Sequence, residues 1–152
     1  MYRLIIKTKE QMAELWQHGQ CLKSYSVSTA ANGVGCEVNS LCTPSGKMQV
    51  AEKIGAGATA GTIFRSRVQT SDIWTTENNI FSAEDLVLTR ILWLEGTEDL
   101  NLNTRDRYIY LHGTNQEDKL GIPASHGCIR FSNKDICEVF NFLEVGSEVI
   151  VE

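Results

Sequence analysis

Short apolar and β-branched runs, separated by polar or glycine-containing turns, make up most of this chain and constrain its fold more than any other feature. Such runs are typical of β-strands, whose side chains alternate between two faces. The segments with this character are 2–8, 22–30, 48–54, 62–68, 86–94, 108–111 and 148–151. Many short strands predict a mainly β protein, built as a β-sandwich or a twisted sheet.

One segment near the C-terminal end has the spacing of a helix instead. Its apolar residues recur at i, i+3, i+4 and i+7, which puts them on one face: Ile136, Val139, Phe140 and Leu143. Ser132 or Asn133 can cap the first turn, and Gly146 is expected to end the helix. We therefore predict one amphipathic helix before the closing strand.

The length fits a single domain spanning residues 1–152. A chain of this size buries roughly 68–70% of its unfolded surface, enough for a core without disulfides or metals. The net charge of −5 argues against nucleic acid as a partner, because nucleic-acid-binding proteins usually present a basic face. No run of like charges and no long apolar segment indicates contact with a membrane.

The number and spacing of the cysteines indicate free thiols. The five cysteines are odd in number and lack the spacing of a disulfide framework: Cys21, Cys36, Cys42, Cys128 and Cys137. The apolar run before Lys7 is also much shorter than the roughly 7–15 residues of a signal-peptide core. Together these features predict a cytoplasmic location. If an export signal had been removed from the chain, a periplasmic location would be expected.

Two short segments carry the chemistry of an activated thiol. One is the sequence His-Gly-Thr-Asn at residues 112–115, and the other is Ser-His-Gly-Cys-Ile-Arg at residues 125–130. Only the thiolate form of a cysteine attacks well, so a catalytic cysteine needs a base and a group that orients that base. We predict Cys128 as the nucleophile, His112 as the base, and the carbonyl of Gly113 as the acceptor that fixes the imidazole tautomer.

The residues around the cysteine suggest how a substrate would be held. Gly127 lets the backbone approach a bound carbonyl, and the N–H groups of Gly127 and Cys128 are candidate oxyanion donors. In an extended segment Arg130 lies on the same side as Cys128, where it could pair with a substrate carboxylate. Ser125 and His126 complete the predicted substrate and oxyanion surround.

Two other interpretations of these residues remain open at this point. Cysteine is often simply a buried packing residue, and Cys128 could be one. A zinc site made of His112, His126 and Cys128 is also conceivable, although it lacks a clear fourth ligand and the usual short ligand spacing. The two histidines and the flanking glycines favour the catalytic interpretation.

The stretch from His112 to Arg130 resembles the signature of the L,D-transpeptidase (YkuD-type) catalytic domain. Further segments are similar to other parts of that family: 25–29, 43–46, 132–135 and 146–150. The resemblance implies a closed β-rich catalytic fold without metal or organic cofactor. It implies that Cys128 attacks the carbonyl of the third, L-configured centre of a peptidoglycan tetrapeptide and releases the terminal D-Ala, with His112 as base and Gly113 orienting it.

The resemblance leaves the acceptor of the thioester open. Water would give a trimmed tripeptide, whereas an amine would give a cross-link. Since a cytoplasmic enzyme meets soluble muropeptides, we expect an L,D-carboxypeptidase that acts in muropeptide recycling. The alternatives are a 3→3 cross-linking L,D-transpeptidase and a catalytically silent muropeptide-binding domain.

The segment 10–17 has two conflicting predictions. Helix propensity favours a short helix over residues 11–15, whereas the family resemblance favours a strand in a hairpin.

Overall fold

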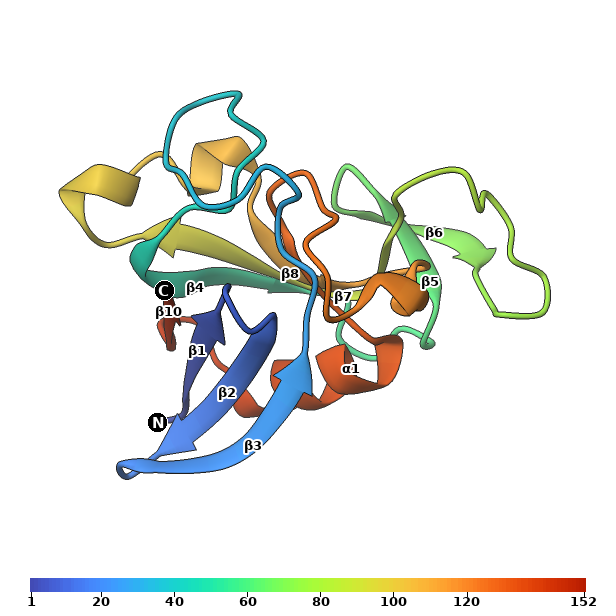
Figure 1. The fold of residues 1–152 in the computed structure, drawn as a ribbon. Helices are drawn as coiled ribbons and strands as arrows, with labels where there is room; N and C mark the ends of the chain where they lie inside the picture. Colours follow the sequence, from blue (N-terminus) through green and yellow to red (C-terminus); the bar gives the residue numbers. More distant parts are fainter.

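Ten strands form one continuous mixed sheet in the computed structural model, which describes residues 1–152 (Figure 1). The strands are β1 (Arg3–Lys7), β2 (Met12–Gln17), β3 (Gln20–Ser26), β4 (Gly46–Ile54), β5 (Thr62–Arg65), β6 (Val68–Ile73), β7 (Val87–Gly96), β8 (Tyr110–Gly113), β9 (Ile129–Phe131) and β10 (Glu148–Val151). The α-helix is α1 (Asn133–Phe142), and three 3₁₀ turns are η1 (Asp99–Asn101), η2 (Arg105–Arg107) and η3 (Glu117–Lys119). The mainly β, twisted-sheet prediction is confirmed.

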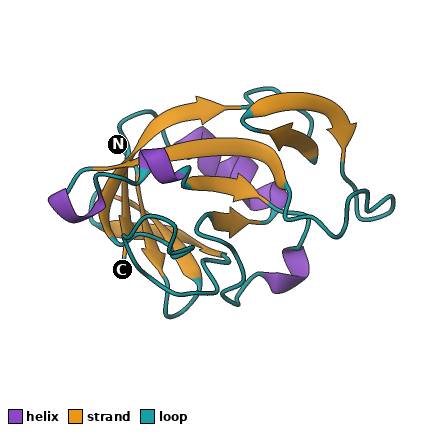
Figure 2. Ribbon diagram, turned by 90° about the horizontal axis from the view of Figure 1, so that it is seen from above, coloured by secondary structure: helices purple, strands orange, loops and turns teal.

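The first and last strands meet inside the sheet. The strand order is β3-β2-β1-β10-β4-β7-β5-β6, and β8 adds to β7 and carries β9. β1 and β10 run parallel, with Leu4 opposite Val149, while β10 and β4 run antiparallel. Figures 1 and 2 show both chain ends at one side of the molecule, away from the β5–β6 hairpin.

The core lies between the sheet and α1, which packs against β7, β8 and β9 (Figure 2). The four predicted helix-face residues are buried as expected: Ile136, Val139, Phe140 and Leu143. They join apolar residues of the central strands in one cluster of 20 buried side chains. This cluster supports β8 and β9 from below, and these two strands hold the catalytic motif.

The helix begins where the sequence predicts and ends earlier. Ser132 is the N-cap, since its Oγ accepts a hydrogen bond from the Asp135 N–H at 3.0 Å. The prediction that Gly146 ends the helix is wrong. Leu143 already has an extended backbone, which keeps its side chain in the core, and Gly146 (φ +91°) makes the turn into β10.

The segment 10–17 forms strand β2, so the interpretation from helix propensity is wrong. β2 pairs with β1 in a hairpin, with Ala13 opposite Ile6 and Leu15 opposite Leu4. Ala13 and Leu15 are both buried, which gives the period of two of a half-buried strand. Burial of this alternating face outweighs the local preference for helix, which is worth only a few tenths of a kcal/mol per residue, about 0.7 at most.

The predicted strand 62–68 is instead a hairpin, because the chain reverses in its middle. β5 and β6 are joined by Ser66 and Arg67, which both have positive φ (48° and 66°). Two residues with positive φ form the turn type that matches the twist of a two-residue hairpin. Strand β6 was not predicted, and the turn brings Arg67 over the site described below.

Candidate active site

Side chains along β8 and β9 point alternately to two faces of the sheet, one facing the core and the other facing the candidate site. The two strands are parallel, with Leu111 opposite Ile129 and His112 opposite Arg130. The odd-numbered side chains enter the core: Ile109, Leu111, Ile129 and Phe131. The even-numbered side chains share the other face: Tyr110, His112, Cys128 and Arg130. The structure thus brings the predicted nucleophile and base together on one face.

Cys128 is half-buried and packs against a small apolar cluster of Phe64, Ile91 and Tyr110. Its Sγ lies 3.3 Å from the Tyr110 N–H, which donates to it, and 3.4 Å from the Tyr108 carbonyl, to which the thiol can donate. Burial raises the pKa of the Cys128 thiol to about 12, against the opposing effect of the Tyr110 N–H. The resting residue is therefore a neutral thiol, and attack requires a base.

His112 is buried and its tautomer is set by the backbone. Its Nδ1 lies 2.6 Å from the carbonyl oxygen of Gly113. Because that oxygen can only accept, Nδ1 carries the proton and Nε2 keeps its lone pair. Burial also lowers the pKa of His112, while the Gly113 carbonyl partly raises it. A neutral imidazole with a free Nε2 is the form that a general base requires.

A bulge in β7 shapes the backbone beside this base. The register between β7 and β8 shifts between Leu88 and Ile91, opposite His112 and Gly113. Thr89 within the bulge has φ +76°, and its Oγ donates to Asn133 Oδ1 at 2.5 Å. A Cβ at Gly113 would lie 2.5 Å from that same Asn133 oxygen. Only glycine therefore fits at position 113.

The turn before Cys128 is fixed by two hydroxyl groups. Ser125 Oγ donates to the Cys128 carbonyl at 2.6 Å and accepts from the Gly127 N–H at 3.2 Å. Thr43 Oγ donates to the Gly127 carbonyl at 2.9 Å. Gly127 itself has φ +135°, a conformation that residues with a side chain rarely adopt. Ser125 thus holds the loop that presents the sulfur.

Only one of the two predicted oxyanion donors is free. The Gly127 N–H is directed at Ser125 Oγ, so the structure does not support it as a donor to substrate. The Cys128 N–H has no acceptor within the protein. A carbonyl attacked by Sγ would carry its developing negative charge next to this group.

Arg130 is placed differently from the prediction. Its side chain is fully buried, and its guanidinium donates to Asp85 Oδ1 and Gln116 Oε1, both at 2.9 Å, and to Ser28 Oγ at 3.2 Å. A direct contact between Arg130 and a substrate carboxylate does not fit this position, because the group is enclosed and already paired. Arg130 instead ties the catalytic strand to three distant segments.

His126 lies at the surface, with 72% of its side chain exposed. Its Nδ1 is 3.7 Å from Asp85 Oδ2, the carboxylate that also holds Arg130. Sequence reasoning missed Asp85, Gln116 and Ser28, because none of them stands in a recognisable motif. Only the folded chain brings them to Arg130.

Aromatic side chains border Cys128 on its other side. Trp93 stacks on Tyr108 with ring centroids 5.9 Å apart and meets Tyr110 edge-on at 5.8 Å. The Arg67 guanidinium lies over Trp93 and Tyr108, and its Nη1 donates to the Tyr110 hydroxyl at 2.9 Å. The three aromatic side chains, Trp93, Tyr108 and Tyr110, are called the aromatic platform below.

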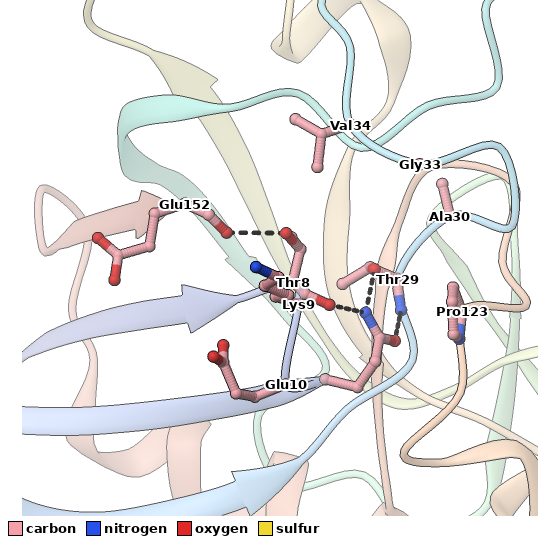
Figure 3. Close-up of a pocket in the computed structure, with 10 residues that line it drawn as sticks. Thr8, Lys9, Glu10, Thr29, Ala30, Gly33, Val34, Pro123 and Glu152 are labelled. Atoms are coloured by element: carbon pink, nitrogen blue, oxygen red, sulfur yellow. Dashed lines mark hydrogen bonds between the residues drawn. The ribbon is translucent and has the colours of Figure 1, made fainter.

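A pocket of about 220 Å³ opens beside the thiol, between the 38–41 loop, the backbone around Tyr108, and His126. A larger pocket of about 490 Å³ lies elsewhere, between the β1–β2 turn and residues 29–34 (Figure 3). Figure 3 shows Lys9, Glu10 and Glu152 around it, and its lining contains no cysteine or histidine. The smaller pocket lies nearer the predicted nucleophile, because it is lined by Tyr108, whose carbonyl lies 3.4 Å from Cys128 Sγ.

No group of three or more histidine, cysteine or acidic side chains is arranged to hold a metal ion. The zinc alternative thus has no ligand set in this structure. The five cysteines are all unpaired. No helix has the length and apolarity needed to span a bilayer.

Comparison with known families shows the family of the chain. The model of the YkuD family, the L,D-transpeptidase catalytic domain, matches residues 1–151. The chain belongs to this family. The predicted membership of the L,D-transpeptidase catalytic domain family is confirmed.

Individual relatives of this YkuD domain agree in fold. An L,D-transpeptidase from Xylanimonas cellulosilytica DSM 15894 superposes with a TM-score of 0.63, at 17% identity over 99% of this chain and 60% of its own. L,D-transpeptidase 3 from Mycobacterium tuberculosis, solved with a faropenem-derived adduct, gives 0.62 at 15% identity, over 99% and 60% of the two chains. The Bacillus subtilis (strain 168) protein YqjB, named as an L,D-transpeptidase, is 38% identical over 48 residues, 32% of this chain and 27% of YqjB. This YkuD domain thus spans 60% of the length of the two solved relatives and 27% of YqjB.

Proposed function

We propose that this domain is a cysteine L,D-carboxypeptidase that removes the terminal D-Ala from peptidoglycan tetrapeptides. The observation that carries the proposal is the pair formed by Cys128, directly before β9, and His112 on β8: a neutral thiol and a buried imidazole whose free Nε2 can take its proton. A thiol–imidazole pair of this kind performs acyl transfer through a thioester. The substrate class comes from the family to which the chain belongs.

The proposed reaction has two steps. Sγ of Cys128 bonds to the carbonyl carbon of the third residue while His112 Nε2 takes the thiol proton, and the Cys128 N–H stabilises the oxyanion. The imidazolium then protonates the leaving nitrogen, the C–N bond breaks, and D-Ala departs. In the second step His112 removes a proton from water, the hydroxide bonds to the thioester carbon, and Sγ leaves and regains its proton. The products are a tripeptide and D-Ala.

Two features support water as the acceptor and short peptides as substrates. The pocket beside Cys128, about 220 Å³, is smaller than the roughly 300–1,000 Å³ typical of sites that enclose drug-sized ligands, so it fits the end of a peptide. The five unpaired cysteines suit a reducing compartment, where muropeptides are soluble fragments. We therefore place the proposed activity in the cytoplasm and in muropeptide recycling.

The second candidate is a 3→3 cross-linking L,D-transpeptidase. The specific observation in its favour is that the solved relatives are L,D-transpeptidases of the same fold. In that case the amine of a second stem peptide replaces water in the second step. A periplasmic location would accompany this activity.

Mass spectrometry of a purified disaccharide-tetrapeptide incubated with the protein distinguishes the two. Loss of one D-Ala by the wild type and none by Cys128→Ala is the expected result. A cross-linked dimer as main product would replace the carboxypeptidase proposal with the transpeptidase. No Cys128-dependent product from the tetrapeptide would refute both.

A further inference from the structure

Arg67 is an arginine at the site that neither the motif nor the catalytic steps use. It occupies the second position of the two-residue turn between β5 and β6, with φ +66°. The turn lifts its side chain over the aromatic platform, where the guanidinium carbon lies 5.0 Å from the Trp93 ring centroid and 4.9 Å from that of Tyr108. Two rings therefore fix the position of this cation.

Two hydrogen bonds of Tyr110, one at its hydroxyl and one at its backbone N–H, connect the guanidinium to the nucleophile. Arg67 Nη1 donates to the Tyr110 hydroxyl at 2.9 Å, and the backbone N–H of Tyr110 donates to Cys128 Sγ at 3.3 Å. The positive charge is thus linked to the sulfur through one tyrosine. Tyr108 links the same two groups, since its carbonyl lies 3.4 Å from Sγ while its ring lies under Arg67.

Arg67 also has unused hydrogen-bonding capacity. A guanidinium has five N–H donors, and here one hydrogen bond, to Tyr110, is made to the protein. The side chain has no carboxylate partner and is partly exposed. The fork of N–H groups that pairs with carboxylates in a bidentate manner is therefore available.

The proposed substrate has a carboxylate beyond the bond that Cys128 attacks. The terminal carboxylate of a tetrapeptide lies one residue beyond the scissile carbonyl, about 3.5 Å further along the chain. With that carbonyl at Sγ, the terminal carboxylate lies beyond the sulfur. The Arg67 guanidinium, which is linked to Sγ through Tyr110, is the candidate group to bind it. Two other arginines near the site are already paired: Arg130 is enclosed and bonded to Asp85, and the Arg107 guanidinium donates to Gly35 O, Ser40 Oγ and Cys42 O.

We propose that Arg67 is the residue that recognises the terminal carboxylate of the peptide, and so makes the site select a free C-terminal D-residue. This assignment rests on the proposed function, because it takes the tetrapeptide as substrate. The rings of the platform hold the guanidinium in place before the substrate arrives, which reduces the entropy lost on binding.

The first test compares a tetrapeptide acid with its C-terminal amide. Arg67→Met is expected to lower kcat/KM for the acid by about 10- to 100-fold, the range for losing a charge-assisted hydrogen-bonded pair, and to change the amide much less. Arg105→Met is the matched control, because Arg105 also lies over Trp93, at 4.8 Å, but has no bond to Tyr110. Equal losses on acid and amide would overturn the proposal.

The second test needs no enzymatic activity. Iodoacetate and iodoacetamide alkylate the same thiol and differ in charge, and peptide mass mapping gives their rate ratio at Cys128 with exposed Cys21 as internal reference. Arg67→Met should lower the iodoacetate-to-iodoacetamide ratio at Cys128 by about threefold or more, whereas Arg105→Met should not. An unchanged ratio would overturn the anion site. A lowered ratio in a protein that releases no D-Ala would instead overturn the proposed function and leave the anion site supported.

Discussion

Two arginines flank Cys128, and their surroundings differ in kind. Arg130 is fully buried, and three side chains from distant parts of the chain accept its hydrogen bonds. Arg67 lies at the surface over two aromatic rings, with one hydrogen bond to a tyrosine hydroxyl. Arg130 is paired within the protein and its one unpartnered donor, Nε, is buried, whereas Arg67 has partly exposed donors left over for a ligand.

The difference shows how to distinguish a structural charge from a binding one in the same site. A buried ion whose partners are built in contributes a fixed geometry, and removing one member leaves the others desolvated and unpaired. A partly exposed guanidinium on an aromatic surface costs little to maintain and retains its capacity to bind a carboxylate. The arginine inside the motif belongs to the first class, and the arginine outside it belongs to the second.

The largest expected effect is at the residue between the two arginines. Cys128→Ala should lower D-Ala release by about 10⁴-fold or more, because no other nucleophile faces the pocket. The fold should persist, with a change in the free energy of unfolding of about 1 kcal/mol or less, since the side chain is only half-buried. The matched control, Cys137→Ala, should retain activity. Equal losses in both variants would mean that Cys128 has a structural role.

The next largest effect is expected at the predicted general base, His112. His112→Gln should lower kcat/KM by about 10²- to 10⁴-fold, the contribution of a general base. Burial lowers the pKa of His112 below its ordinary value of 6.5, so the neutral base persists to lower pH and activity should fall only as pH drops through that lowered pKa. A pH–rate profile of the wild type measures this. An acid limb at or above pH 6.5 would contradict the assignment.

The lowered pKa of His112 also predicts how the stability of the fold depends on pH. Below pH 6.5 the unfolded chain binds a proton at His112 that the folded state disfavours, so the stability of the wild type should fall as the pH is lowered. His112→Gln should show a smaller loss over the same range in denaturant titrations.

Replacing the buried Arg130 should lower the stability of the fold more than replacing the partly exposed Arg67. Arg130→Met is expected to lower the free energy of unfolding by about 3 kcal/mol, since Asp85 and Gln116 lose their buried partner. Arg67→Met should change it by about 1 kcal/mol or less, as expected for an exposed cation–π contact. Urea denaturation monitored by tryptophan fluorescence measures both. Similar values for the two variants would remove the distinction drawn between them.

A similarly small effect on stability is expected at the turn that precedes Cys128. Ser125→Ala should cost about 1 kcal/mol, because it removes one hydrogen bond to the Cys128 carbonyl and leaves the Gly127 N–H without its acceptor. Ser26→Ala, at an exposed serine on β3, is the control and should be neutral. An unchanged stability in Ser125→Ala would show that the turn is held by Thr43 and the backbone alone.

Sequence reasoning identifies what is local in this site. The alternation of β1 and β10, the helix face that includes Ile136, and the Cys128–His112 pair all follow from spacing within short segments. The partners of Arg130 do not, since Ser28 and Asp85 are 102 and 45 residues away along the chain. Without them Arg130 resembles a ligand for substrate, and its burial is visible only after folding.

The turn at Ser66 and Arg67 is a second feature that the local sequence does not predict. Residues 62–68 have the composition of one strand, and neither Ser66 nor Arg67 is a residue that favours positive φ. The reversal is imposed by pairing of β5 with both β6 and β7. Long-range pairing thus overrides local preference here, as it does in β2.

The central position of β10 has a consequence for synthesis of the protein. In the sheet order, β10 stands between the β1–β3 hairpins and β4, and the ribosome makes it after every residue of the catalytic motif. Contacts as distant as Leu4 with Val149 must form before the two parts of the sheet join, which makes folding slow. While the chain is growing, the thiol of Cys128 therefore exists without the finished scaffold around it. The sheet that carries the Cys128 motif is completed only when residues 148–151 pair with β1 and β4.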